Sequence, residues 1–264
     1  MSVTDEAKQP FVIAIANEKG GVGKTTTTLS IGTILAQKGY KVLFVDLDPQ
    51  GNLTLSLGYK PHEMPTPNFG LATGGTIFAK DSYQTEHENL DLVFARTLIV
   101  NDVYQVQVNT GDDDYFLSQD LRVMRSLSYD YVIIDCPPAI GKIMVSTLLV
   151  SDFLIIPSQA EFFSAFALKD MMDLIGVVRQ EGNPGIPYRI LITLFDRRNR
   201  VHHSIKNQLN HTFGAGIFNT MIEIDTEMRK TAILGFPTKN SRGVKQYRKL
   251  VDELLENIQT TRST

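Results

Sequence analysis

Cysteine and long apolar segments are nearly absent from this sequence of 264 residues. Cys136 is the single cysteine, so the chain cannot form an internal disulfide or offer a cysteine cluster to a metal. No segment approaches the ~20 apolar residues that a membrane-spanning helix needs. Residues 1–10 are polar and lack the hydrophobic segment of a signal peptide. We therefore expect a soluble, cytoplasmic protein in which Cys136 is a buried thiol.

Charge is distributed unevenly, although the net charge is only −3. Residues 188–249 hold 12 Lys and Arg against four Asp and Glu, a balance of +8, so the remainder carries −11. Such an asymmetry favours an anionic partner for one surface, and a solvated basic face is the simpler alternative.

The hydrophobic content of 42% is sufficient for one well-buried core. Five short apolar runs read as buried strands, with helix-length stretches between them. They cover residues 11–17, 41–46, 131–135, 153–157 and 189–195. This alternation implies right-handed crossovers and a parallel sheet. We predict an α/β fold: a doubly wound, mostly parallel sheet with helices on both faces.

The predicted single domain covers residues 11–258, between a polar tail at 1–10 and a frayed tail at 259–264. Residues 60–75 and 109–114 are expected to be surface excursions. The last predicted helix covers residues 244–258, and its apolar residues recur at three- to four-residue spacing, which predicts a core-facing stripe. Lys245, Arg248 and Lys249 lie off this stripe and are expected to face solvent.

A glycine-rich loop with two lysines follows the first predicted strand and precedes a helix. It consists of Lys19, Gly20, Gly21, Val22, Gly23, Lys24, Thr25 and Thr26. This context is the one that a phosphate-binding loop requires, because backbone N–H groups close around the phosphates and the helix N-terminus adds partial positive charge. We expect ATP and Mg²⁺ as cofactors, with Lys24 at the β- and γ-phosphates and the Thr25 hydroxyl on Mg²⁺. The alternative is a glycine-rich turn without a ligand.

The loop departs from the general P-loop pattern, because Glu18 stands where the ordinary motif has glycine and Lys19 follows it. In this form it resembles the deviant Walker A box, KGGxGK[ST], of the ParA/MinD family, which has the P-loop NTPase fold. The string FVDLDPQGN at 44–52 resembles the next ParA motif, and YDYVIIDCPP at 129–138 resembles its Walker B strand. Residues 159–163 and 193–198 also look like ParA. Residues 225–240 depart from the family pattern.

The resemblance implies roles for individual residues. Lys19 would reach across a dimer interface to the phosphates of the partner's nucleotide. A carboxylate at a strand end beside a phosphate loop is placed to hold Mg²⁺ through water, and by the resemblance this is Asp46, while Asp48 orients the attacking water. Asp135 ends an apolar run, where a buried carboxylate needs a cation or hydrogen bonds, and it is expected to be a further Mg²⁺ acid. Asp196 would lie near the adenine.

The function implied by the resemblance is slow ATP hydrolysis by a homodimer that closes around ATP. A ParB-like or other adaptor would stimulate hydrolysis, and the cargo would be a plasmid, a chromosome or a protein organelle. The ATP state is expected to bind duplex DNA without sequence preference, which would associate the protein with the nucleoid. The DNA-binding candidates, all from the basic segment, are Arg197, Arg198, Lys230, Arg242, Lys245, Arg248 and Lys249.

Three other classes share the loop or a related fold. A nitrogenase-type iron protein needs two cysteines from each subunit for its cluster, which this chain does not supply. A MinD-like membrane-surface ATPase needs a basic, apolar-faced C-terminal helix, and the residues after Leu255 are too polar for that. An ATP-dependent metabolic ligase stays open, because the sequence does not exclude a substrate pocket.

Overall fold

The computed structural model describes residues 9–60, 83–94, 122, 124–230, 235–236 and 240–263. Its centre is a seven-stranded sheet in the order β3-β4-β2-β5-β1-β6-β7. The strands are β1 (Phe11–Ile15), β2 (Val42–Asp46), β3 (Tyr83–Gln84), β4 (Leu90–Phe94), β5 (Tyr131–Asp135), β6 (Phe153–Gln159) and β7 (Tyr188–Thr193). Neighbouring strands run parallel, except that β3 is antiparallel to β4. The predicted fold class is therefore confirmed.

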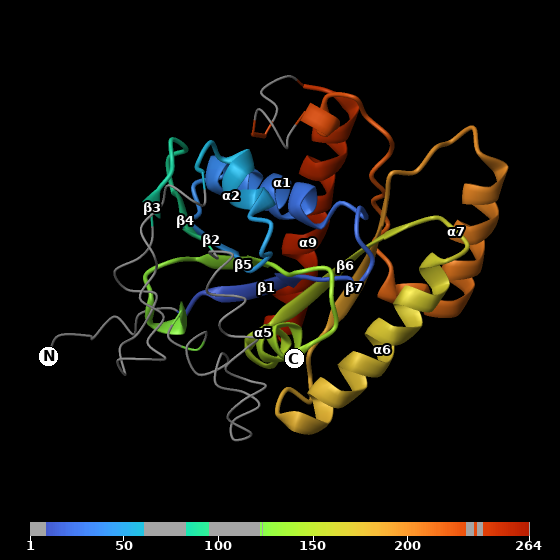
Figure 1. Ribbon diagram of the computed structural model, residues 1–264, viewed down its shortest axis with the longest axis horizontal. Helices are drawn as coiled ribbons and strands as arrows, with labels where there is room; N and C mark the ends of the chain where they lie inside the picture. Colours follow the sequence, from blue (N-terminus) through green and yellow to red (C-terminus); the bar gives the residue numbers. More distant parts are fainter. Residues whose placement is uncertain are drawn as a thin grey trace, which may run out of the picture.

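Helices cover both faces of the sheet (Figure 1). On one face lie α1 (Lys24–Gln37), α2 (Asn52–Ser56) and α9 (Arg242–Ser263), and on the other lie α5 (Lys142–Val150), α6 (Ser164–Glu181) and α7 (Arg200–Phe213). Short 3₁₀ turns occur at Met124–Ser126, Gly214–Gly216 and Met228–Lys230. The described residues do not include residues 1–8 of the predicted tail. They also leave out most of the two predicted excursions, at 60–75 and 109–114.

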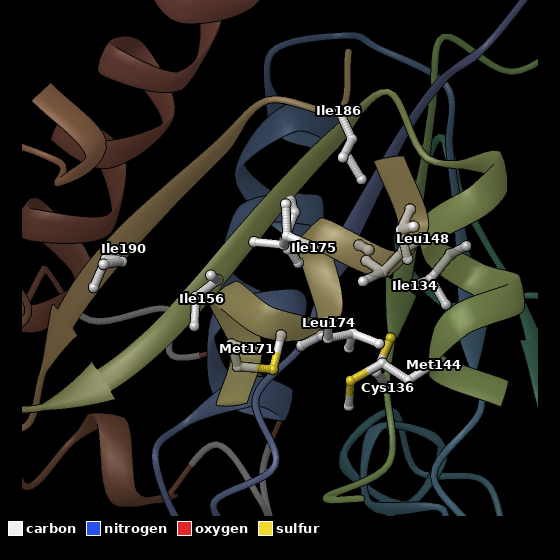
Figure 2. Close-up of a cluster of buried hydrophobic side chains, with 14 of the residues drawn as sticks. Ile134, Cys136, Met144, Leu148, Ile156, Met171, Leu174, Ile175, Ile186 and Ile190 are labelled. Carbon is white, nitrogen blue, oxygen red and sulfur yellow. The ribbon is translucent and has the colours of Figure 1, made fainter. Parts of the chain in front are cut away.

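Each face of the sheet builds its own hydrophobic core. Along β1, Val12 and Ala14 face the core beneath α5 and α6, whereas Phe11, Ile13 and Ile15 face the core beneath α1 and α9. This alternation follows from the two-residue period of a strand, and it explains why the central strands are apolar on both sides. Figure 2 shows Cys136 inside the first of these cores, so its expected burial is confirmed. Burial raises the pKa of its thiol.

The helix that follows the glycine-rich loop is enclosed by β2 and α9. A side chain at Gly32 would collide with the ring of Phe44, so only glycine lets α1 approach β2 this closely. On its other side, Thr27 Oγ1 and the hydroxyl of Tyr247 share a buried hydrogen bond of 3.1 Å. Burial raises the pKa of this tyrosine to about 12. The first turn of α1 is therefore bonded directly to α9.

Helix α9 is longer than predicted. It runs to Ser263, so the expectation of a frayed tail at 259–264 is wrong as far as that residue. No glycine or proline interrupts residues 244–263, and Ile258 is buried in the core, so nothing stops the helix there. Lys245, Arg248 and Lys249 are exposed, as predicted. None of the described helices combines the length and apolar character that crossing a bilayer requires.

Candidate nucleotide site

The glycine-rich loop leaves the end of β1 and leads into α1, as predicted. Gly21 and Gly23 have φ values of 74° and 87°, a region that residues with a Cβ rarely adopt. Gly23 directly precedes the first residue of α1, so the unpaired N–H groups of that helix start lie at the loop. The loop borders a cavity of about 350 Å³, lined by Gly20, Gly21, Gly23, Lys24, Thr25, Thr26, Leu29, Asp48, Gln50, Asn52, Ser56 and Pro138.

Side chains from three strand ends hold the loop in place. Asn17 Nδ2 donates to the carbonyl of Pro157 at 2.8 Å, and its Oδ1 accepts from the N–H of Lys19 at 2.9 Å. Gln159 Nε2 donates to the carbonyl of Gly21 at 3.0 Å. Thr193 Oγ1 donates to the carbonyl of the buried Val22 at 2.8 Å. Val22 therefore anchors the loop and does not line the cavity.

Lys24 is the more buried of the two loop lysines, at 6% exposure. Its Nζ donates to the carbonyl of Lys19 at 3.1 Å, across the turn of the loop. Burial lowers the pKa of Lys24, and the nearby carboxylate of Asp135 opposes that shift. A cation that is partly stripped of water gains more from an anionic ligand than an exposed lysine would.

Asp135 ends β5 and is fully buried. It accepts hydrogen bonds from Thr25 Oγ1 at 2.7 Å and from Thr28 Oγ1 at 3.3 Å. Burial raises the pKa of this carboxyl well above its usual range; repulsion from Asp46 adds to the shift, and the bond from Thr25 opposes it. The two residues predicted to act on Mg²⁺ from the loop and from β5 are thus in direct contact.

Asp46 and Asp48 differ in where their carboxylates point. Asp46 ends β2 beside Asp135 in register, and it accepts bonds from the hydroxyl and N–H of Thr54 at 2.6 and 2.9 Å and from the N–H of Asp48 at 3.2 Å. Burial raises the pKa of Asp46 to about 6 despite these bonds. Asp48 lines the cavity and accepts from the N–H of Gln50 at 3.0 Å. Asp48, unlike Asp46, therefore borders the loop cavity directly.

The side chain of Lys19 is paired with an acid of its own chain. Its Nζ forms an ion pair of 2.7 Å with Glu161 Oε2, with the lysine side chain 27% and the glutamate side chain 49% exposed. The residues that follow Glu161 leave three phenylalanine rings exposed, those of Phe162, Phe163 and Phe166. The segment with these three exposed rings therefore lies next to the glycine-rich loop, because Glu161 at its start is paired with Lys19.

The seven basic candidates fall into two groups. Four are paired with acids: Arg198 with Asp196, Lys230 with Glu227, and Arg197 and Arg242 both with Glu223. The other three, Lys245, Arg248 and Lys249, are exposed on α9 and form no ion pair within the described part of the chain.

Asp196 does not line the cavity. Its carboxylate accepts bonds from the guanidinium and the N–H of Arg198, which lower its pKa. Thr193, three residues earlier, contacts the loop. The role of Asp196 near the adenine stays a prediction.

Comparison with known proteins identifies the family. A family model described as an AAA domain matches residues 11–187. The chain is 32% identical, over 253 residues, to the chromosome partitioning protein ParA of Caulobacter vibrioides, an alignment that covers 92% of this chain and 93% of that protein. The chain belongs to the ParA family of ATPases. The AAA model ends before the basic segment 188–249, whereas the ParA relative is similar across nearly the whole chain.

Solved structures resemble this ParA-family chain over its full fold. One is a plasmid partition protein of Borrelia burgdorferi bound to AMPPNP, with 25% identity, a TM-score of 0.77, and coverage of 94% of this chain and 100% of that one. Another is the cobyrinic acid a,c-diamide synthase of Mycobacterium smegmatis with bound ADP and magnesium, with 29% identity, a TM-score of 0.76, and coverage of 95% and 96%. Both have the P-loop NTPase fold that the sequence predicted.

Proposed function

We propose that this chain is an ATP-dependent, dimerising ParA-type ATPase whose ATP state binds DNA without sequence preference and positions a cargo through an adaptor protein. The observation that carries the proposal is the connection between two sites. The loop cavity and the basic half of α9 are joined through α1, which begins in the loop and is bonded to α9 by the Thr27–Tyr247 contact. A change at the loop therefore has a short physical route to the basic helix.

The donor set at the loop fits a magnesium nucleotide. The backbone N–H groups and Lys24 would hold the phosphates, and the Thr25 hydroxyl would ligate Mg²⁺, with Asp135 and Asp46 beside it. Two buried carboxyls with raised pKa values on adjacent strands favour a nearby cation. Within the described residues, no three His, Cys, Asp or Glu side chains are grouped to hold a metal by themselves. This agrees with Mg²⁺, which is usually held by one or two carboxylates, water and substrate phosphates.

Hydrolysis by this site needs positioning and charge neutralisation more than covalent chemistry. Mg²⁺, when bound, would neutralise charge on the phosphates. Asp48 borders the same cavity as Lys24 and the loop glycines, so it is our candidate for orienting the attacking water. The expected hydrolysis is slow and stimulated by the adaptor.

Dimerisation is supported by the surface beside the loop. Phe162 and Phe163 are each 71% exposed and follow directly after Glu161, the partner of Lys19. Contiguous exposed apolar groups mark interaction surfaces more often than isolated ones do. A second copy of the chain that approached the loop would cover these rings and bring its own Lys19 toward the nucleotide.

A ligase is the second candidate, because the synthase of related fold matches nearly as well as the partition protein does. The two functions differ in the fate of ATP. A ligase would consume ATP in step with formation of an amide product, whereas the proposed ATPase turns ATP over without a second substrate and retains ATP on DNA.

The experiment measures binding to several unrelated duplexes with ATP, with ADP and without nucleotide, over a salt series. Tight binding is expected only with ATP, and the slope of log K against log salt should be about −5 to −7 for six to eight phosphate contacts. Asp48→Ala should bind ATP and stay on DNA while hydrolysing ~10²–10⁴-fold more slowly. Equal binding in all three nucleotide states, or none with ATP at moderate salt, would reject the DNA switch.

A further inference from the structure

A buried carboxylate, Glu223, binds two of the exposed arginines. Arg197 donates from Nε to Glu223 Oε1 at 2.7 Å, and its Nη2 lies 2.6 Å from the same oxygen in an ion pair. Arg242 donates from Nη1 to Oε2 at 3.1 Å. The arginine side chains are 70% and 67% exposed, whereas Glu223 is 3% exposed. One acid thus fixes two cations that come from different elements, the loop after β7 and the first residue of α9.

Glu223 is itself rigidly held. Gln246 Nε2 donates to Oε1 at 2.8 Å, and the Gln246 side-chain oxygen accepts from the N–H of Glu223 at 3.0 Å. The backbone on either side of Glu223 is bonded to Phe195, with Phe195 donating to the carbonyl of Ile222 and accepting from the N–H of Ile224. The carboxylate therefore cannot follow a moving arginine, and the arginines must adopt the positions it dictates.

This arrangement leaves excess positive charge at the surface. Two guanidinium groups share one carboxylate, and within the described residues Nη1 of Arg197 and Nε and Nη2 of Arg242 make no further hydrogen bond. Planar guanidinium groups with free N–H donors suit phosphate oxygens. Lys245 and Lys249 follow Arg242 at three and seven residues along α9, which puts all three on one side of the helix.

The acids of α9 lie elsewhere. Residues 242–249 contain four basic and no acidic residues, and Asp252, Glu253 and Glu256 come only after them. Asp252 pairs with Lys38, and Glu253 accepts from the N–H groups of Asn219 and Thr220. Asp225 accepts from the N–H of Gly243 at 2.7 Å, at the start of α9. Within the described residues, Glu223 is the one carboxylate that forms an ion pair with a basic side chain of residues 242–249.

We propose that Glu223 is a positioning residue for DNA binding: it fixes Arg197 and Arg242 so that the loop after β7 and the start of α9 present one phosphate-binding surface to duplex DNA. The inference rests on the proposed DNA-binding function. It predicts that removing the negative charge of Glu223 changes the affinity for DNA in the direction opposite to that expected from bulk charge alone. Removing a negative charge beside a DNA-binding surface should tighten binding if only bulk charge matters, whereas it should weaken binding if the charge holds two arginines in place.

The test measures ATP-dependent binding of the full chain to a random-sequence duplex over a salt series for the parental protein, Glu223→Gln and Gln246→Ala. We expect Glu223→Gln to weaken binding about tenfold per lost contact at 0.1 M salt, and to flatten the salt slope by about 0.9 per contact. Gln246→Ala changes no charge but loosens the carboxylate, so it should weaken binding in the same direction. Arg197→Ala should lower affinity in the parental protein and have a smaller effect beside Glu223→Gln.

The matched control is Glu253→Gln, which also removes one negative charge, in this case from α9, at a carboxylate that forms no ion pair with an arginine in the described contacts. This variant should not weaken binding. Thermal unfolding and ATP hydrolysis without DNA identify any variant that has lost its fold. If Glu223→Gln is such a variant, the DNA affinity of Gln246→Ala decides whether Glu223 positions the two arginines. Parental-like or tighter binding by both variants would overturn the role of Glu223. Failure of the parental protein to bind DNA would instead reject the proposed function.

Discussion

Lys19 and Lys24 stand five positions apart in one loop but have different surroundings. Lys24 is buried and bonded within the loop, whereas Lys19 is partly exposed and paired with Glu161. A buried lysine beside the cavity is suited to binding phosphates of its own nucleotide. A partly exposed lysine can leave its partner at a small cost, because such ion pairs contribute roughly 0–1 kcal/mol.

These surroundings predict different losses on substitution. Lys24→Ala should abolish ATP binding, because the loop loses the cation that meets the β- and γ-phosphates. Lys19→Ala should keep measurable nucleotide affinity and fail to form the closed ATP dimer. Equilibrium binding of a fluorescent ATP analogue and light scattering with ATP measure the two effects. Normal dimerisation and hydrolysis by Lys19→Ala would remove the role across the interface.

The ion pair between Lys19 and Glu161 makes a second prediction. If Lys19 must leave Glu161 to reach a partner's nucleotide, Glu161→Gln should favour the ATP dimer by up to about fivefold, which corresponds to an exposed pair of up to ~1 kcal/mol. The concentration of protein at half-maximal dimerisation with ATP is the measurement. Asp173→Asn is the control, since it breaks a different exposed ion pair, the one with Lys169 within α6, and should change nothing. A weaker dimer in Glu161→Gln would mean that Glu161 itself supports the interface.

At the scale of elements, the contact between α1 and α9 is open to a conservative test. Tyr247→Phe removes only the hydroxyl that bonds Thr27 Oγ1, and it leaves Thr27 without this partner in a buried site. The expected loss is about 1–2 kcal/mol of unfolding free energy, measured by urea denaturation. Tyr188→Phe, at a half-buried tyrosine of β7, is the control and should cost less. If Tyr247→Phe also lowers ATP-dependent DNA binding, the contact between α1 and α9 couples the nucleotide site to the basic half of α9.

The elements that sequence analysis found share one property. Each of the five predicted strands is an apolar run buried on both faces, and such a run is recognisable without knowledge of its neighbours. Strand β4 contains Asp91, whose carboxylate accepts a bond from Tyr129, and it lacks an uninterrupted apolar run. The sequence does not predict the C-terminal extension of α9, because residues 259–263 (QTTRS) contain no apolar residue that continues the stripe beyond Ile258.

The residues of the candidate site also differ in whether a contiguous stretch of sequence is enough to predict them. Local order in the sequence predicts the loop, Asp48 and Asp135 as site residues, because each belongs to a contiguous motif at a strand end. Asn17, Thr193 and Glu223 could not be assigned in this way. Asn17 meets Pro157, and Thr193 meets Val22, only because the sheet order places β6 beside β1 and β7 beside β6. Glu223 meets its arginines only because the loop after β7 and the start of α9 come together in the fold.

For the whole molecule, the buried acids predict how stability depends on pH. Burial raises the pKa of Asp46 from 3.8 to about 6, so the folded state binds more protons than the unfolded state between these values. Stability from this group is therefore lost as pH rises from about 4 to 6, and the penalty is full above that range. A shift of this size corresponds to about 3 kcal/mol.

The measurement compares Asp46→Asn with the parental protein, both without nucleotide and in a metal chelator. Asparagine keeps an oxygen for the bonds from Thr54 but cannot ionise. The stability of the variant relative to the parental protein should rise by about 2–3 kcal/mol from pH 4 to pH 7. A difference that is constant across this range would mean that Asp46 does not titrate near 6.

The packing of α9 on α1 also governs when the protein can become active during its synthesis. The glycine-rich loop and α1 leave the ribosome early, but the core that buries the apolar face of α1 is completed by α9. The buried residues of α9, from Val244 to Ile258, are made last among the described core residues. Chains emerge N-terminal end first, and contacts between distant segments form late. A nascent chain should therefore hold an exposed, incompletely packed α1 until α9 has been translated, and a ribosome stalled before residue 242 should display a chain that chaperones recognise and that ATP does not protect.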